Sequence, residues 1–469
     1  MKKLNVLQRT IRVVSLIIIT LLCSFLNTGC ESFIKPDDPK GQIPQEAVFE
    51  DEKTATAAVT SLYGSLRDNV ILTGGFDGMN VLMGYYADEL DYYGLPGQAG
   101  ETFYNHQILA SDGRVKSLWN LAFNHIYMCN SAKEGIEASR NLSSEVKDQL
   151  QGEVLFIRAI THFYLVNLFG DIPYITTTDY LVNKDVSRLP VDLVYEKILS
   201  DLSDARSKLT EEYVTGERIR VNKYAVSALL SRVFLYLQRW QDAVTESTIL
   251  LSASSVFAIE SDLTQEFLKG SSSAILQLKP KNNGDNTKEA SVFLFTSGPP
   301  LNMALNPVFV ESFEPGDLRR QNWIKEIQGV GGLWYAPYKY RQREPTGVSQ
   351  EYSIVLRLAE QYLIRAEALA HTGDLPGAIE DINIIRSRAG LPGTTATTET
   401  EILQAISDER KFELFTEQGH RWFDLKRMGK AGEVLTPLKP NWDPTHILFP
   451  IPESELLLNP HLLPQNPGY

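Results

Sequence analysis

The sequence predicts a mainly α-helical protein, with a scaffold of tetratricopeptide-like helical hairpins that carries a long, irregular, loop-rich region and minor β structure. Three observations support this fold class. Apolar residues recur three and four positions apart through much of the chain, as they do on the buried face of a helix. Tight corners separate pairs of such runs. The stretch over about 254–351 loses the periodicity and is rich in Gly, Ser, Asn and Pro.

The first 29 residues are typical of a lipoprotein signal peptide. A basic start precedes an apolar run from Val13 to Leu26, which is short for a membrane-spanning helix and ends at small residues. The stretch that leads to Cys30 resembles a bacterial lipobox, although Asn27 stands where an aliphatic residue is usual. We therefore predict cleavage before Cys30 and acylation of its thiol, which anchors the protein to a membrane. An unmodified thiol after an ordinary signal peptide is the alternative.

A polar segment over 30–45 separates the signal peptide from the rest of the chain. It contains three prolines and the acidic pair Asp37-Asp38, and we predict a tether that lifts a single domain over 46–469 off the membrane. The whole chain has a formal net charge of −13, which argues against a nucleic-acid partner because such proteins need a basic surface. The same negative charge is a poor match for an anionic lipid surface, so the lipid on Cys30 must supply the membrane attachment.

Helical periodicity begins soon after the tether. It is visible over Ala55–Leu66, Leu118–Ile136 and Val194–Leu209. Further along, two hairpins share one pattern, the first around Leu230–Ala243 and the second around Tyr362–Ile385. In each, small residues twelve positions apart (Ser231 with Ala243, Ala366 with Ala378) allow paired helices to approach closely. This is the logic of tetratricopeptide repeats, although no strict repeat period runs through the chain.

The residue types at the corner of the second hairpin predict a tight turn between two helices. Gly373 follows the first helical run, Asp374 is placed to cap the next helix, and Pro376 falls in the first turn of that helix. The second run stops at Gly390-Leu391-Pro392. We predict a tight αα-hairpin here.

Two irregular inserts, about 73–111 and 254–351, interrupt the helices. The longer one contains two strand-like runs, Ala274–Leu278 and Val292–Phe295. Loops of this length within a compact domain are usually functional or disordered, and the aromatic content of these two favours function.

Five segments in order resemble the SusD/RagB family, spread over nearly the whole mature chain. The first, from Gly152 to Pro173, contains Gly152-Glu153-Val154-Leu155-Phe156-Ile157-Arg158-Ala159 and Phe169-Gly170-Asp171-Ile172-Pro173. The others are Val194–Leu202, Leu356–Ala368, Glu409–Leu425 with Arg421-Trp422-Phe423-Asp424-Leu425, and Phe449–Tyr469 with Gln465-Asn466-Pro467-Gly468-Tyr469. Each segment is weak evidence by itself, but five in register form a specific pattern.

The resemblance implies both the fold and the function. Members of this family are outer-membrane lipoproteins that face the cell exterior, do not act as enzymes, and sit over a TonB-dependent, SusC-like transporter barrel. They hand it glycans or, in some branches, peptides. We therefore expect a glycan (oligo- or polysaccharide) ligand and a SusC-like partner, with a peptide ligand as the alternative. A secreted helical glycoside hydrolase and a protein-binding helical adaptor are the other hypotheses.

No strong catalytic signature appears in the sequence, and we predict no catalytic residues. Glu409 and Glu413 are the sharpest candidates for a carboxylate pair, but Arg410 lies between them, and a neighbouring arginine keeps an acid ionised. A general acid needs the opposite. We predict an ion-paired scaffold instead, with Arg410 and Glu413 three positions apart and Glu417 and Arg421 four apart.

No metal site and no cofactor are predicted. The seven histidines lack the spacing of a zinc motif, and Cys129 is the single mature thiol besides Cys30. Asp88, Glu89 and Asp91 form an acidic group that could ligate a hard cation such as calcium. We favour a solvated loop for these three residues.

The binding hypothesis rests on aromatic residues in the two irregular regions. Sugar rings pack their C–H faces on flat aromatic side chains, and polar side chains bind their hydroxyl groups. We predict ligand contacts from two clusters, and we expect Tyr340, next to Lys339, to be structural instead. The predicted ligand-binding residues are Tyr85, Tyr86, Tyr92, Tyr93, Trp323, Trp334, Tyr335 and Tyr338.

Overall fold

The computed structural model describes residues 2–25 and 45–469 and divides the chain into two compact units, residues 1–48 and 49–469. The first unit contains α1 (Lys2–Phe25) and α2 (Gln45–Val48). Cys30 and most of the predicted tether lie outside the described residues, so the signal peptide, lipidation and tether stay predictions. The second unit, here called the body, begins three residues after the boundary that we predicted.

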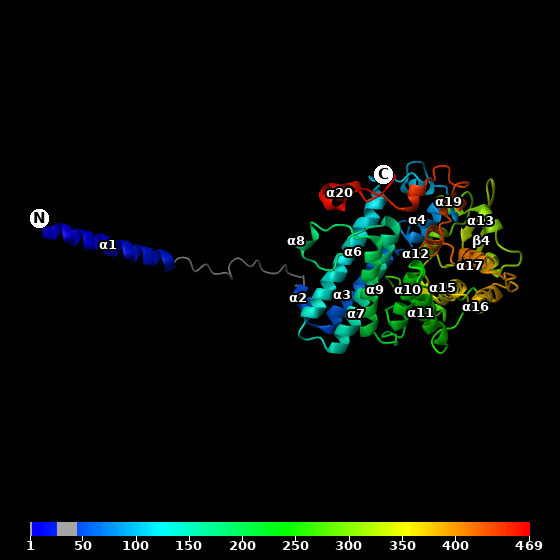
Figure 1. Cartoon of the computed structure of the whole chain (residues 1–469), viewed down its shortest axis with the longest axis horizontal. Coiled ribbons are helices and arrows are strands. Elements are labelled where there is room, and N and C mark those ends of the chain that lie inside the picture. Colours follow the sequence, from blue (N-terminus) through cyan, green and yellow to red (C-terminus); the bar gives the residue numbers. More distant parts are fainter. Residues whose placement is uncertain (1, 26–44) are drawn as a thin grey trace. The chain divides into compact units, whose positions relative to one another are not determined.

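Four long helices form the first half of the body: α3 (Glu52–Asp68), α6 (Gly113–Ala138), α7 (Ser144–Phe169) and α9 (Val191–Lys208). They confirm the three predicted helical runs. Helix α7 lies at the centre and packs against the other three (Figure 1). Every residue from Leu150 to Phe169 is buried. By length and composition α7 could also cross a membrane, but its apolar part is wholly enclosed, as expected for a core helix.

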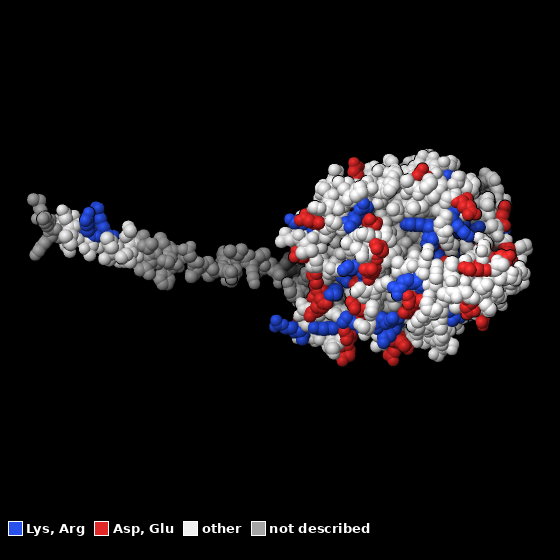
Figure 2. Space-filling model, viewed as in Figure 1, with Lys and Arg blue, Asp and Glu red and all other residues white. Residues whose placement is uncertain are grey.

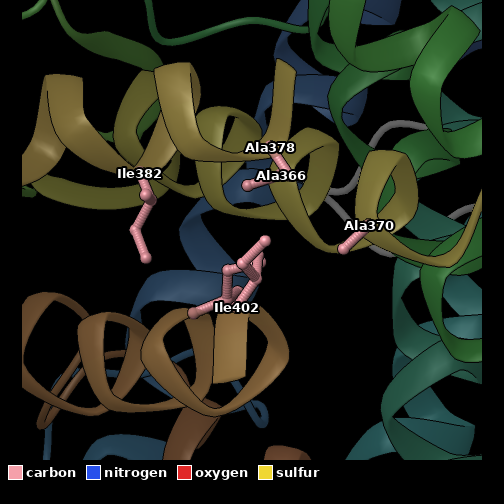
Figure 3. Close-up of a cluster of buried hydrophobic side chains, with 6 residues drawn as sticks. Ala366, Ala370, Ala378, Ile382 and Ile402 are labelled. Carbon is pink, nitrogen blue, oxygen red and sulfur yellow. The ribbon is translucent and has the colours of Figure 1, made fainter. Parts of the chain in front are cut away.

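Helical hairpins form the second half, as predicted. They are α10 (Lys223–Tyr236) with α11 (Trp240–Ser252), and α15 (Leu358–His371) with α16 (Leu375–Arg388), followed by α17 (Glu399–Glu413). Figure 3 shows Ala366 and Ala378 facing each other between α15 and α16, with Ile402 of α17 packed beneath them. Both alanines are fully buried, so the small residues bring the helix backbones together as the sequence pattern indicates.

The helix ends follow the predicted chemistry. Gly373 has a positive φ of 86°, which a residue with a Cβ rarely adopts. The side chain of Asp374 accepts a hydrogen bond from the backbone N–H of Gly377 at 3.1 Å and caps α16. Helix α17 begins with a capping box formed by Thr398 and Glu401.

The β structure consists of three antiparallel two-stranded sheets within the described residues. They pair β1 (Leu90–Tyr92) with β3 (Met303–Leu305), β2 (Ala274–Leu278) with β6 (Ser353–Arg357), and β4 (Ile324–Gly329) with β5 (Gly332–Pro337). The predicted strand Ala274–Leu278 is confirmed. Its partner β6 is followed immediately by α15, so this two-stranded sheet is joined directly to the helical hairpins.

The predicted strand at Val292–Phe295 is wrong. Its first two residues end α12 (Lys288–Phe293) and its last two belong to no helix or strand. The side chain of Thr287 accepts from the backbone N–H of Ala290 and caps this short helix. The inserts also contain α4 (Met79–Tyr86), α5 (Ala99–Tyr104), α13 (Pro307–Glu311) and α14 (Leu318–Trp323). The remaining short helices are α8 (Tyr180–Asn183), α18 (His420–Arg427), α19 (Ala431–Leu435), η2 (Pro444–Ile447), α20 (Glu453–Leu458) and η3 (Pro460–Leu462).

Candidate functional site

The two irregular inserts meet at one surface, which we call the aromatic site (Tyr92, Tyr93 and Trp334). Strand β1 of the first insert pairs with β3 of the second, and the backbone N–H of Tyr93 donates to the carbonyl of Asn302 at 2.7 Å. Strand β3 in turn packs against β5, which carries Trp334. Residues about 240 positions apart in the chain are thereby held on one small β platform.

The rings of Tyr93 and Trp334 form the centre of the site. Their centroids lie 5.0 Å apart with an interplanar angle of 88°, an edge-to-face contact. Both rings are partly exposed. Gly298 packs directly on the indole ring, where a Cβ would overlap it, and the backbone N–H of Val330 donates to the Gly298 carbonyl at 3.0 Å. The ring of Trp334 is therefore fixed from one side.

Apolar side chains with high exposure lie in the loops and the strand that carry or adjoin these rings. Leu95, Leu301 and Val330 are 69%, 85% and 83% exposed, and Leu333 of β5 is exposed as well. An apolar patch rimmed by polar groups is a common mark of a binding site. We call these four aliphatic residues the rim of the aromatic site. We did not predict them as part of a site, because isolated aliphatic residues in loops form no sequence pattern.

Tyr92 belongs to a second layer of rings behind the exposed pair. It contacts Tyr85 edge-to-face at 5.6 Å and Tyr104 at 6.4 Å. The ammonium group of Lys439 lies 3.7 Å from the centroid of Tyr104 and donates to the carbonyl of Tyr85 at 2.9 Å. Burial lowers the pKa of Lys439 to about 8. The hydroxyl of Tyr92 donates to the carbonyl of Leu95 at 2.8 Å, which fixes the loop beside the rings.

Four of the predicted ligand-binding aromatics are buried, and their prediction as contact residues is wrong. Tyr86 is fully enclosed among core rings and donates to the carbonyl of His446 at 2.9 Å. Trp323 is fully enclosed and donates through Nε1 to the carbonyl of Leu263 at 3.0 Å. Tyr85 and Tyr335 are 2% and 8% exposed. These positions fill the core because the inserts fold onto the scaffold and need apolar side chains of their own.

Tyr338 is partly exposed but lies apart from the ring pair. Two cations lie over its ring: Lys325, at 5.2 Å from the centroid, and Arg341, at 5.0 Å. Tyr340 is buried and accepts a hydrogen bond from the backbone N–H of Ile354 at 2.8 Å, which confirms the structural role that we predicted for it.

Comparison with known proteins agrees with these features. Two family models match the chain: one described as "Starch-binding associating with outer membrane" matches residues 95–235, and one described as "SusD family" matches residues 329–469. A SusD-like protein P25 from Formosa agariphila is 26% identical over 97% of this chain and 99% of its own length. The chain belongs to the SusD/RagB family.

Solved structures show the same fold. A laminarin-binding SusD-like protein matches this SusD-family chain with a TM-score of 0.77 and 24% identity, over 90% of this chain and all of its own. Surface glycan-binding protein A from Bacteroides thetaiotaomicron, in complex with laminarihexaose, matches with a TM-score of 0.74 and 18% identity, over 88% of this chain and 99% of its own. The mainly helical, tetratricopeptide-like fold that we predicted is confirmed.

The acidic residues of α17 in this SusD-family protein are bound by buried arginines. Arg319 and Arg386 donate to Glu409 at 2.8 and 2.7 Å, and Arg357 donates to Glu413 at 2.5 Å. Burial alone would raise the pKa of Glu413, but Arg388, Arg357 and Arg319 hold it well below its ordinary value. Both carboxylates are inaccessible to solvent, so this pair is an ion-paired scaffold, as predicted, rather than a hydrolytic pair.

The partners that we predicted within α17 and the segment after it are wrong. Arg410 binds Asp424 at 2.8 Å instead of Glu413, and Arg421 binds Asp88 at 2.7 Å instead of Glu417. These side chains are buried and point toward neighbouring elements, so the spacing along the helix does not select their partners. Figure 2 shows charges of both signs interspersed over one face of the body, without a large basic surface.

The acidic group near β1 is neither a solvated loop nor a cation site. Asp88 is held by Arg421, Glu89 is 2% exposed, and Asp91 accepts from the side-chain amide of Asn306 at 2.9 Å. Among the described residues, no group of three His, Cys, Asp or Glu side chains is arranged to hold a metal ion.

Proposed function

We propose that this protein is a non-enzymatic lipoprotein of the outer-membrane surface that binds an oligo- or polysaccharide at the aromatic site. The observation that carries this proposal is the Tyr93–Trp334 pair, which is partly exposed and brought together by the pairing of β1 with β3 and the contact of β3 with β5. Flat rings of this kind bind the apolar C–H faces of sugars. The family's description as starch-binding, and two structural relatives named for laminarin or laminarihexaose, support a glycan as the ligand class.

Polar side chains beside the rings can bind sugar hydroxyls. Asn302 is partly exposed, neighbours the exposed Leu301, and accepts a hydrogen bond from the backbone N–H of Tyr93 through its own carbonyl. Gln98 and Gln328 are exposed in the adjoining loop and strand. Neutral amides donate and accept hydrogen bonds at once, which suits hydroxyl groups.

A peptide ligand is the second candidate, and the rim favours it. Leu95, Leu301, Val330 and Leu333 offer aliphatic surface, which binds apolar side chains better than it binds hydroxylated rings. Both candidates use the same site, so the same variants test them.

The test is calorimetric titration of the purified lipoprotein with laminarihexaose, maltohexaose and a mixed peptide pool. We expect a hexasaccharide to bind and Trp334→Ala to weaken its affinity about tenfold, because one ring contact contributes about 1–1.5 kcal/mol. Trp240→Ala is the matched control, since Trp240 is also partly exposed but lies on α11 of the scaffold. Peptide binding without glycan binding would select the second candidate.

Product analysis separates binding from hydrolysis. After prolonged incubation we expect the hexasaccharides to be recovered intact, and shortened products would refute the non-enzymatic proposal.

We further propose that acylated Cys30 anchors the protein on the exterior face and that the bound glycan is delivered to a TonB-dependent, SusC-like transporter. This partner follows from the family resemblance. The test is a pull-down of the tagged lipoprotein from outer membranes of the native host, which should recover a large β-barrel protein. Recovery without any barrel would count against delivery while leaving glycan binding intact.

A further inference from the structure

A second groove lined by aromatic rings lies on the other side of the body, where α6 is flanked by α8 and the C-terminal α20 (Figure 1). Its volume is about 620 Å³. Trp119, Phe123 and Tyr127 follow one another along α6 at intervals of four residues, so their side chains form a row on one helix face. Tyr180 of α8 completes the aromatic lining.

Some rings of this α6–α8–α20 groove are buried in its floor, and others are exposed to solvent. Trp119 is 4% exposed and packs against Phe123 at 4.7 Å and Phe169 at 5.0 Å, so it is a fixed part of the groove floor. Tyr127 and Tyr180 are 52% and 73% exposed. Two tyrosine rings are therefore offered to solvent beside a rigid aromatic base.

Amide side chains alternate with these rings. Asn120 and Asn124 are exposed on α6 and line the groove next to Trp119 and Phe123. Within the described part of the chain, neither amide side chain makes a hydrogen bond to protein. Each keeps two donors and an acceptor for a ligand.

The walls of the groove are anchored to the helical scaffold. The carboxylate of Glu134 accepts from the backbone N–H of Thr178 at 2.9 Å and from the hydroxyl of Thr177 at 3.0 Å, which holds the segment before α8. At the end of α20, the side chain of Asn459 donates to the carbonyl of Val186, in the segment after α8, at 2.8 Å and joins the two walls to each other. The groove is thus preformed, and a ligand need not order it.

We propose that this groove is a second saccharide-binding site, which takes a neutral oligosaccharide segment. Its rings offer flat surfaces to C–H faces, and its free amides offer partners to hydroxyls. The charged residues of its lining are Lys184 and Glu455, which have opposite signs, and the surface over α20 is mostly uncharged in Figure 2. This inference rests on the proposed function for its ligand class, but it uses none of the residues of the aromatic site.

A protein partner is the competing occupant, because Leu181, Val182 and Leu457 beside the groove are 71%, 57% and 77% exposed. These three side chains do not line the groove itself. Its lining contains four rings and four amides, together with Pro173 and the aliphatic side chains Ile175, Val186, Leu458 and Leu462. The row of rings with unpaired amides beside it favours a saccharide within the groove.

Two sites on one rigid body have a consequence for polymeric ligands. A glycan chain long enough to reach both sites binds the second one intramolecularly, at a high effective concentration. A hexasaccharide fills each site independently. Removing the groove should therefore weaken polymer binding by more than tenfold, while the aromatic site still binds the hexasaccharide with unchanged affinity.

The test uses the full lipoprotein with Tyr127→Ala and Tyr180→Ala combined, because both rings are exposed and their loss leaves the core intact. Titration with laminarihexaose should give two sites per wild-type molecule and one in the double variant. Trp334→Ala should keep two sites, with the affinity of one of them weakened about tenfold. Laminarin affinity should fall in the double variant. The matched control is Leu181→Ala with Val182→Ala on α8, which should change neither measurement.

The outcomes separate this inference from the proposed function. One site that Trp334→Ala weakens and the double variant leaves unchanged would overturn the second site and keep the first. One site that only the double variant abolishes would support the groove and overturn the aromatic site. Loss of barrel capture in the double variant, with glycan stoichiometry unchanged, would make the groove a docking surface. No binding of either probe to the wild type would overturn both.

Discussion

Glu89 is a buried carboxyl group directly before the strand that carries Tyr92. It accepts one hydrogen bond, from the backbone N–H of Thr416 at 3.2 Å, and lies beside the charged Asp88. Burial, reinforced by Asp88, raises the pKa of Glu89 to about 8. In the folded protein this carboxyl group therefore stays protonated at neutral pH, although in the unfolded chain it ionises near 4.5.

This difference predicts a pH-dependent stability. The folded state gains from neutral Glu89 below pH 4.5 and loses that advantage as the pH rises from about 4.5 to about 8. We expect Glu89→Gln, which is neutral at every pH, to become more stable relative to wild type by about 1 kcal/mol per pH unit in this window. Urea unfolding between pH 5 and 9 measures it, with the exposed Glu344→Gln as the control. Parallel profiles for wild type and Glu89→Gln would contradict the prediction.

Arg357 tests the buried network at the same scale. Its guanidinium group donates to Glu413 at 2.5 Å, Glu417 at 2.7 Å and Glu266 at 3.2 Å, and all four residues are buried. Arg357→Met would leave carboxylates buried without their partner, and we expect a loss of about 3–5 kcal/mol in the free energy of unfolding. The exposed pair of Lys279 with Glu217 is the control, since Lys279→Met should cost about 1 kcal/mol or less. Equal losses of unfolding free energy in Arg357→Met and Lys279→Met, measured by urea unfolding, would show that burial does not determine how much an ion pair contributes to stability.

At the scale of the element, close helix packing depends on alanines at the α15–α16 contact. Ala378 is fully buried in a cluster with Ala366, Ile382 and Ile402. Ala378→Leu adds three carbon atoms where no space exists, and we expect a destabilisation of about 1–3 kcal/mol by urea unfolding. Ala57→Leu on the exposed face of α3 is the control and should change stability little. If Ala378→Leu left the free energy of unfolding unchanged, α15 and α16 could move apart without a loss of stability, which would contradict the prediction.

The same elements show what the sequence could and could not predict. Helical hairpins were predictable because periodicity and capping are local properties, as Asp374 and its helix demonstrate. The pairing of β2 with β6 was not, because the partners lie some 80 residues apart and no local pattern links them. Tyr86 and Tyr93 are equally aromatic and only seven positions apart, yet one fills the core and the other reaches solvent. Which ring faces outward is decided by how the insert folds onto the scaffold.

At the scale of the whole molecule, the body offers two aromatic surfaces built from different parts of the chain. The aromatic site depends on the inserts, whereas the α6–α8–α20 groove is built on a scaffold helix. The groove could not be predicted from the sequence, because the spacing of Trp119, Phe123 and Tyr127 also fits an ordinary buried helix face. Exposure of Tyr127 separates the two interpretations, and exposure is a property of the assembled body.

The sequence predicts that an acylated Cys30 attaches the protein to a membrane, which the proposed capture of a polymer at the cell surface requires. We expect Cys30→Ser to move the protein from the membrane fraction to the soluble fraction, because several acyl chains on one residue supply the attachment and an acidic body does not. Cys129→Ser should remain in the membrane fraction, since Cys129 is a fully buried thiol of the body. The measurement is membrane fractionation with mass spectrometry of the mature N-terminus. A Cys30→Ser protein that stays with the membrane would mean that a protein surface holds it there, and the exposed aliphatic residues of α8 and α20 would be the first place to look for that contact.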